Sequence, residues 1–149
     1  MNIKRLGIGV LTGLGLTTMV ATEIAIAADQ IFVPGLVYRT GPYAPNGIPF
    51  ANGMQDYLTL INERDGGING VKIVHEECET GYNTKVGVEC YEKLKSKKPV
   101  TVIPNSTGIT YQLIPKSYKD NIPLLTMGYG RTSAAVASVF PWVFNFPAT

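Results

Sequence analysis

Residues 61–73 read INERDGGINGVKI, and this stretch decides the fold. Upstream of it, apolar residues recur at three- and four-residue steps, which places them on one face of a helix. These residues are Phe50, Met54, Tyr57 with Leu58, and Ile61. The sequence Asp65-Gly66-Gly67 ends the helix, because glycine adopts the left-handed conformation of a C-cap. Val71 and Ile73 then alternate with Lys72 and Val74 as in a strand that extends toward His75.

The same alternation continues on both sides of this stretch. An apolar run over residues 31–38 predicts a strand, in which Pro34 is expected at the start or at a bulge because it cannot donate a ladder hydrogen bond. Asn83 or Thr84 is expected to cap a second helix. The side chains on one face of that helix are Val86, Cys90 and Leu94.

The C-terminal half repeats the pattern. Short β-branched or apolar runs predict strands over residues 100–103, 124–127 and 142–146. A third amphipathic helix lies between the first two of them, and Pro115 is expected to kink or shorten it. Its apolar residues are Tyr111, Leu113, Ile114 and Tyr118. Strands and helices in alternation predict an α/β fold, with an open, mostly parallel sheet and helices on both faces.

The N-terminus has the pattern of a secretory signal peptide. Lys4 and Arg5 precede an uncharged run over residues 6–20, and Ala25-Ile26-Ala27 provides a cleavage site. The alternative is an uncleaved membrane anchor, but the run is shorter than the ~20 residues that span a bilayer. We therefore expect a signal peptide over residues 1–27 and a mature chain over residues 28–149.

Composition excludes two classes of function. The 149 residues include 13 Lys and Arg against 11 Asp and Glu, a formal charge of +2, and only 16% are charged. A chain of this kind is neither a highly charged disordered protein nor one with the excess of clustered cations that nucleic acid requires. We expect no nucleic-acid partner.

The two cysteines, Cys78 and Cys90, are expected to form a structural disulfide, since export brings the chain into an oxidising compartment. The alternatives are a metal site or a nucleophile. No further Cys or His lies at zinc spacing, and His75 is the single histidine. We expect no metal and no cofactor.

Three polar loops follow predicted strands, over residues 39–47, 105–108 and 128–133. Ligands of open α/β sheets bind at the carboxyl ends of the strands, where these loops meet. Ser106 and Thr107 offer hydroxyls and backbone N–H groups that suit a carboxylate, and Arg131 can add a bidentate contact. Tyr43 and Tyr129 are candidates for a wall against the ligand. The alternative for each hydroxyl is an ordinary helix N-cap.

Catalysis has little support in these loops. Ser106 does not lie in a G-x-S-x-G elbow, and none of the three loops contains Asp or Glu. A nucleophile with its base, or a pair of acids, is therefore missing from them. We do not expect an enzyme.

Two motifs resemble one known family. The run Thr40-Gly41-Pro42-Tyr43-Ala44 and the INERDGGING stretch over 61–70 are similar to the opening of the branched-chain amino-acid-type periplasmic binding proteins. These are the type I solute-binding components of ABC importers. Segments 106–108, 122–126 and 141–144 agree with the same family, so the resemblance covers the mature chain.

The resemblance implies two lobes hinged around a cleft, of which residues 28–149 form the N-terminal part of the first. It also implies a periplasmic protein that passes a small solute to a membrane permease: an amino acid, an aromatic or aliphatic carboxylate, or an amide. The implied ligand-binding residues are Asn46, Ser106, Thr107, Gly128, Tyr129, Gly130 and Arg131.

Three residues depart from the family pattern. Amino-acid binders commonly carry Thr at the position of Gly130, and smaller or uncharged residues at those of Tyr129 and Arg131, so a different ligand is expected. In the branched-chain binders the partner of the first cysteine lies where this chain has Ser106, which makes Cys90 a local variation.

The resemblance also implies that a second lobe follows residue 149. The isolated mature segment is therefore expected to be marginally stable and to bind solute weakly. Two alternative functions remain, the ligand-binding module of a sensor or receptor, and an exported α/β enzyme.

Overall fold

The computed structural model describes residues 30–127, 134 and 136–146. The predicted signal peptide and its cleavage site lie outside this range. The elements are β1 (Gln30–Val37), α1 (Ala44–Arg64), β2 (Lys72–Glu79), α2 (Thr84–Leu94), the 3-10 helix η1 (Lys95–Lys97), β3 (Ile103–Pro104), α3 (Thr107–Asp120), β4 (Leu124–Thr126) and β5 (Val143–Asn145).

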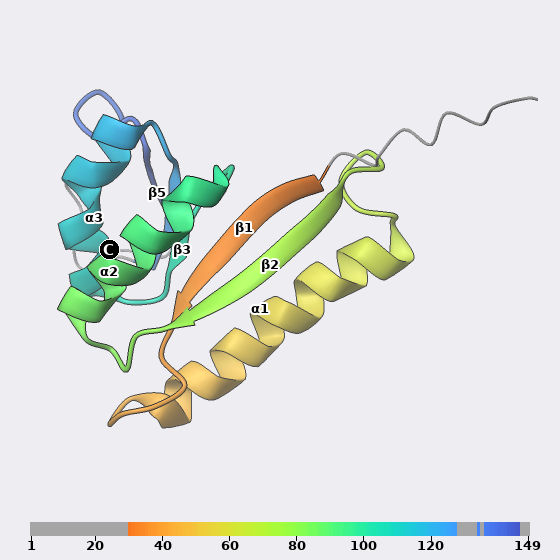
Figure 1. Cartoon of the computed structure of the whole chain (residues 1–149), viewed down its shortest axis with the longest axis horizontal. Coiled ribbons are helices and arrows are strands. Elements are labelled where there is room, and N and C mark those ends of the chain that lie inside the picture. Colours follow the sequence, from red (N-terminus) through yellow and green to blue (C-terminus); the bar gives the residue numbers. More distant parts are fainter. Residues whose placement is uncertain (1–29, 128–133, 135, 147–149) are drawn as a thin grey trace, which may run out of the picture.

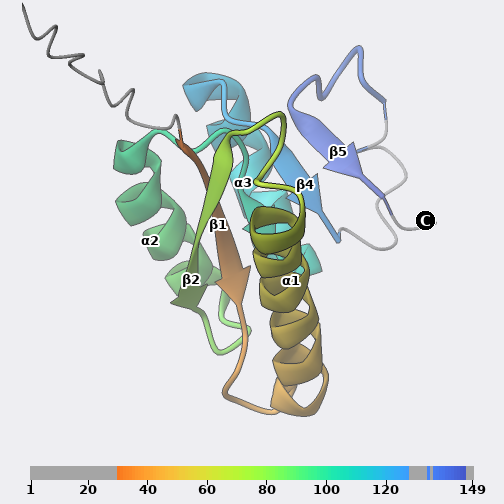
Figure 2. The ribbon, with the colours of Figure 1, turned by 90° about the vertical axis from the view of Figure 1, so that its right-hand side faces the viewer.

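The strands are parallel and lie in the order β2-β1-β3, followed by the pair β4-β5. A parallel bridge between Val102 and Leu124 connects the two groups, and the backbone N–H of Leu125 donates to the carbonyl of Val102 at 3.0 Å. Helix α1 lies on one face of the sheet, and α2 and α3 lie on the other (Figures 1 and 2). We call these the α1 face and the α2/α3 face. The predicted α/β class with a parallel sheet is confirmed.

The main core fills the α2/α3 face. Leu36 of β1, Tyr91 of α2 and Leu113 of α3 are fully buried in one cluster. Gly87 allows α2 to approach α3 closely, because a Cβ there would lie 2.6 Å from the side chain of Ile109. The Cys78–Cys90 disulfide, which the sequence predicted, joins β2 to α2 on this same face.

The α1 face is covered less completely. Helix α1 buries only Gly47 and Ala51, and Phe50 and Tyr57 are 38% and 61% exposed. Phe50 and Tyr57, which the spacing places on one face of the helix with Met54, are therefore exposed, whereas Met54 is half-buried. Its buried positions are the small residues Gly47 and Ala51, and a Cβ at Gly47 would lie 1.9 Å from the carbonyl oxygen of Tyr38.

Pro34 lies inside β1 without a bulge, which corrects the expectation for that residue. The carbonyls of Phe32 and Leu36 both accept hydrogen bonds from the β3 side. Backbone groups two residues apart in a strand point to the same side, so the nitrogen of Pro34, which has no hydrogen to donate, also points toward β3. The β1–β3 ladder begins only at Gly35, and no partner is lost.

Two further expectations about elements are wrong. Helix α3 is not shortened at Pro115: it continues through this residue to Asp120, with the Ser106 side chain as its N-cap and a left-handed Asn121 as its C-cap. The third strand is also shorter and later than predicted, at residues 103–104 with a bridge at Val102.

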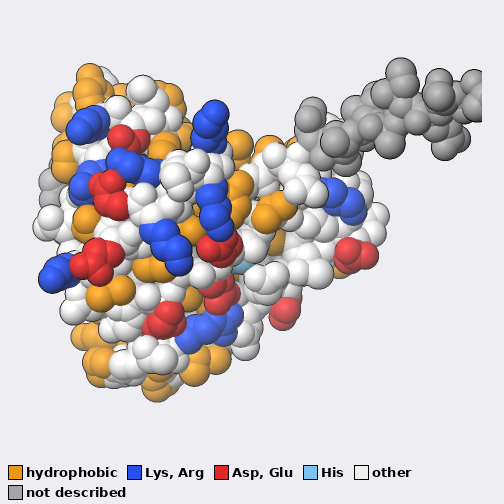
Figure 3. Space-filling view, in the orientation of Figure 1, with side chains coloured by type: hydrophobic (Ala, Val, Ile, Leu, Met, Phe, Trp, Pro, Cys, Tyr) orange, Lys and Arg blue, Asp and Glu red, His pale blue; other side chains and the backbone are white. Residues whose placement is uncertain are grey.

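Charged side chains of both signs are interspersed over the α2/α3 side of the molecule (Figure 3). Lys95 of η1 contacts Glu92 at 2.7 Å and Asp120 at 3.1 Å, and Lys116 of α3 contacts the same Glu92 at 2.6 Å. Lys95 and Lys97, which follow α2, thus form ion pairs within the fold. Among the helices that the structure describes, none is both long and apolar enough to span a membrane.

Candidate functional site

A cavity of about 170 Å³ lies where the carboxyl ends of four strands meet the start of α1. Tyr38 follows β1, Tyr82 follows β2, Asn105 and Thr107 follow β3, and Met127 follows β4. Asn46 and Phe50 of α1 complete the described lining. This is the edge of a parallel sheet at which ligands of α/β proteins bind.

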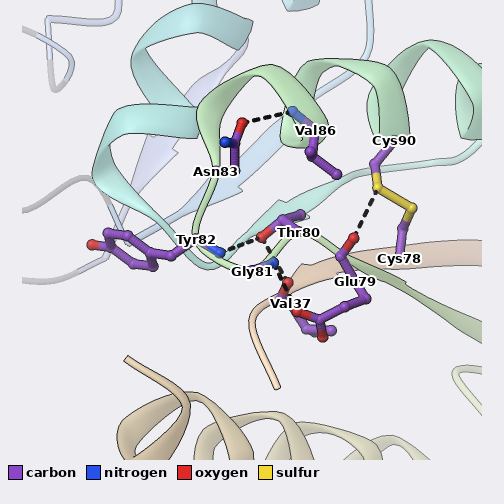
Figure 4. Close-up of a disulfide and its surroundings, with 9 residues drawn as sticks. All are labelled: Val37, Cys78, Glu79, Thr80, Gly81, Tyr82, Asn83, Val86 and Cys90. Carbon is purple, nitrogen blue, oxygen red and sulfur yellow. Dashed lines mark hydrogen bonds between the residues drawn. A yellow bond between two sulfur atoms is a disulfide. The ribbon is translucent and has the colours of Figure 1, made fainter. Parts of the chain in front are cut away.

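The turn after β2 holds Tyr82 in place (Figure 4). The hydroxyl of Thr80 donates to the carbonyl of Val37 at 2.8 Å and accepts from the backbone N–H of Tyr82 at 3.2 Å. Tyr82 has a left-handed backbone with φ of 64°, which is uncommon outside glycine and asparagine. Asn83 then caps α2 by accepting from the backbone N–H of Val86, so the chain is fixed on both sides of Tyr82.

Three tyrosines from two loops, the β1–α1 loop and the β2–α2 loop, pack together beside the cavity. The rings of Tyr38 and Tyr82 meet edge to face with centroids 4.8 Å apart, and the tilted ring of Tyr43 lies 4.4 Å from that of Tyr82. Mutual packing of this kind stabilises ring orientation. Two of these rings, Tyr38 and Tyr82, form a preorganised aromatic wall of the cavity.

The carboxylate of Glu79 joins the loops that carry these rings. It accepts from the backbone N–H groups of Arg39 and Gly81, each at 2.7 Å, and from the hydroxyl of Thr40 at 3.0 Å. Burial by itself would raise the pKa of Glu79, but these hydrogen bonds outweigh it and hold the pKa below its ordinary value. The charged form of Glu79 therefore fixes the two loops relative to each other.

The other charges near these loops are paired. Arg39 binds both carboxylate oxygens of Glu77, at 2.6 and 2.7 Å, and also donates to the side chain of Asn52 at 2.7 Å. Among the described residues that line the cavity, none is charged. The cavity thus offers aromatic, amide, hydroxyl and thioether groups to a ligand.

The predicted ligand-binding residues have different places in the structure. Asn46 and Thr107 line the cavity. Ser106 does not: it is 2% exposed, and its hydroxyl accepts from the backbone N–H of Ile109 as the N-cap of α3. Tyr43 contacts Tyr82 rather than the cavity. The predicted Gly128, Tyr129, Gly130 and Arg131 lie outside the described residues.

The sequence reasoning missed five lining residues, namely Tyr38, Phe50, Tyr82, Asn105 and Met127. Tyr38 and Phe50 belong to apolar runs that read as strand and helix core. The loop that holds Tyr82 was not among the three predicted loops, although it follows a strand in the same direction as they do. Counting every loop after a parallel strand is the signal that would have found it.

A larger cavity of about 400 Å³ lies elsewhere, between α3 and residues 139–143. Its walls are mainly apolar, including Ile114, Tyr118 and Trp142. It lies away from the carboxyl ends of β1 to β3, and size alone does not make a site. The smaller cavity has the converging polar groups that ligand recognition requires.

Within the described ranges, no group of three or more His, Cys, Asp or Glu side chains is placed to hold a metal ion. His75 lies in β2, where its Nδ1 pairs with the carbonyl of Val33 at 2.6 Å. It is not among the residues that line either cavity.

Comparison with known proteins fits this geometry. A family model described as periplasmic binding protein matches residues 30–149. The chain belongs to the periplasmic binding protein family. No curated protein matches it significantly.

Solved structures of this family share the fold. A protein described as an ABC transporter permease from the Pseudomonas fluorescens group is 43% identical, with a TM-score of 0.71, over 78% of this chain and 29% of that one. The branched-chain amino acid transporter substrate-binding protein LivJ from Streptococcus pneumoniae, in complex with isoleucine, is 20% identical with a TM-score of 0.69, over 78% and 33%.

A solute-binding protein of an ABC transporter from Rhodopseudomonas palustris BisB5, in complex with 3,4-dihydroxybenzoic acid, is 19% identical with a TM-score of 0.65. That match covers 78% of this chain and 31% of the other. The chain thus spans about a third of the length of these type I binding proteins.

Proposed function

We propose that this chain is part of the exported solute-binding component of an ABC importer. It binds an amino acid or a related small carboxylate or amide in a cleft between two lobes, and delivers it to a membrane permease in the periplasm. The observation that carries the proposal is the cavity at the carboxyl ends of β1 to β4, with its amide, hydroxyl and aromatic lining. Family members of this fold are described with isoleucine and with 3,4-dihydroxybenzoic acid bound.

The proposed mechanism consists of solute binding and lobe closure, without a chemical reaction. Asn46 and Thr107 contact the solute from this lobe, and the loop over residues 128–131 adds Arg131 for a carboxylate. Closure of a second lobe over the solute then shifts the population toward a closed form that the permease recognises. Ser106 supports the site indirectly, because it caps the helix that begins with Thr107.

The proposal assigns no catalytic step to the chain. General acid–base or nucleophilic chemistry needs a titratable group at the ligand. The described lining of the cavity consists of aromatic, amide, hydroxyl and thioether side chains. Binding followed by release is the chemistry that such a lining supports.

A thermal-shift screen of the full-length protein against amino acids, aromatic acids and short amides tests the proposal. We expect at least one compound to raise the melting temperature in a saturable way, because a ligand that binds only the folded state stabilises it. Titration calorimetry then measures its affinity in the wild type and in Arg131→Ala. The absence of binding by every class of compound would contradict the proposal, and an unchanged affinity in R131A would remove Arg131 from the site.

A further inference from the structure

We propose that Asn105 makes this site select solutes whose aromatic ring carries a hydrogen-bond donor, a hydroxyl or an N–H group. The inference rests on the proposed solute-binding function and names the class of solute. It begins with one atom: the side-chain oxygen of Asn105 is buried and has no hydrogen-bond partner in the part of the chain that the structure describes. The residue is only 6% exposed and lines the cavity.

The backbone of Asn105 is held in place beside the cavity. Its backbone N–H donates to the carbonyl of Leu36 at 3.1 Å, and the next residue, Ser106, caps α3. The direction of the side chain follows from the register of the sheet. Ile103 pairs with Gly35, where a Cβ would meet Met54 of α1 at 2.8 Å. Two residues further along, Asn105 lies on the same α1 face.

A buried acceptor of this kind favours a ligand that donates to it. The free-energy cost of leaving a buried polar atom without a hydrogen bond exceeds the free energy that a solvent-exposed hydrogen bond contributes. A solute that donates to Asn105 therefore binds more tightly than one that does not. Sites built on such an acceptor reject analogues that lack the donor. Asn46, the other amide of the lining, is exposed and imposes no comparable demand.

The remaining walls define the body of the solute. Tyr38 and Tyr82 present rings held at 86° to each other, and Phe50 of α1 adds a third ring to the lining. Flat apolar walls without a charge accommodate an aromatic ring better than an ammonium or carboxylate group. The charged end of such a solute therefore points away from Asn105, toward groups outside this lining.

The test uses benzoate, 3-hydroxybenzoate and 4-hydroxybenzoate as matched probes, titrated into the full-length protein by calorimetry. We expect at least one hydroxybenzoate to bind about tenfold or more tightly than benzoate. In Asn105→Leu the discrimination should disappear, with benzoate binding as well as in the wild type or better. In Asn105→Asp, which keeps an acceptor oxygen, the preference for the hydroxylated ring should persist. Thermal melts of both variants report whether they fold.

Two results would overturn the inference. One is equal affinity of the wild type for benzoate and both hydroxybenzoates, which needs no variant. The other is a folded N105L protein that keeps the discrimination. Binding of leucine or another aliphatic amino acid, with no binding of the aromatic acids, would leave the proposed solute-binding function intact and refute the aromatic class alone. A protein that binds none of the amino acids, aromatic acids or amides would instead refute the proposed function.

Discussion

The two faces of the sheet differ in how they are held. On the α2/α3 face, Leu36, Tyr91 and Leu113 are fully buried, and the Lys95–Asp120 ion pair joins η1 to α3. On the α1 face, one long helix packs through Gly47 and Ala51 and leaves Phe50 and Tyr57 exposed. The first face therefore carries most of the stability of this segment, and the second carries one wall of the ligand cavity.

A matched pair of truncations tests this comparison most strongly. Leu113→Ala removes a fully buried side chain from the α2/α3 face and should cost about 2–5 kcal/mol of unfolding free energy. Leu58→Ala removes the same atoms from the half-buried side of α1 and should cost about half as much or less. Denaturant unfolding of the full-length protein measures both. Equal losses would show that the two faces contribute equally.

The close contact of α1 with β1 gives the second test. Gly47→Ala places a Cβ 1.9 Å from the carbonyl oxygen of Tyr38, so the helix must shift, at a cost of about 1–3 kcal/mol. Because Tyr38 and Asn46 line the cavity, solute binding should weaken as well. Gly53→Ala is the control in the same helix: nothing lies within 4 Å of its Cβ, and it should stabilise by about 0.5–1 kcal/mol. A G47A variant with wild-type melting temperature and affinity would contradict this account.

The third and smallest expected effect concerns Glu79, which joins the loops of the two faces. Its pKa in the folded protein lies below the ordinary value of 4.5, so its contribution to stability is present above that value and is lost as the pH falls through the folded pKa. Since the residue is exposed, Glu79→Gln should cost less than about 1 kcal/mol at pH 7.

Melting temperatures between pH 7 and pH 3 measure this dependence. The wild type should lose more stability over the acid range than E79Q, because the variant has no carboxylate to protonate there. Glu89→Gln, in an exposed position of α2, controls for the loss of one negative charge. If E79Q and the wild type lose stability in parallel, the hydrogen bonds of Glu79 do not couple the loops.

Local signals in the sequence predicted the elements well. Period-two and period-3.6 patterns indicated β1, β2, α1, α2 and the parallel sheet, and the glycines after Arg64 marked the end of α1. The effect of the two prolines was predicted incorrectly: Pro34 costs no ladder hydrogen bond, because β1 pairs with β3 only from Gly35 onward, and α3 continues past Pro115. Whether a missing donor matters depends on the neighbouring strand or turn, which no local pattern reports.

The candidate site was predicted in part. The loop over residues 105–108 and the residues Asn46 and Thr107 were identified from hydroxyls, amides and the resemblance to a family. Tyr82 and Phe50 were missed, because each looks like a packing residue when only its sequence neighbours are considered. They reach one cavity because four parallel strands end at the same edge of the sheet.

The sequence by itself determined the alternation of strands and helices, the disulfide partners and the edge of the sheet at which the candidate cavity lies. These features follow from the periodicity of apolar residues, from the number of cysteines and from chain direction. Each of these can be read from a short segment or counted along the sequence. Only the tertiary structure decided that Asn105 is buried with an unpaired oxygen and that α1 packs through Gly47 rather than its aromatic residues. Burial and close approach depend on what the other strands and helices place nearby, and that information is spread over the whole chain.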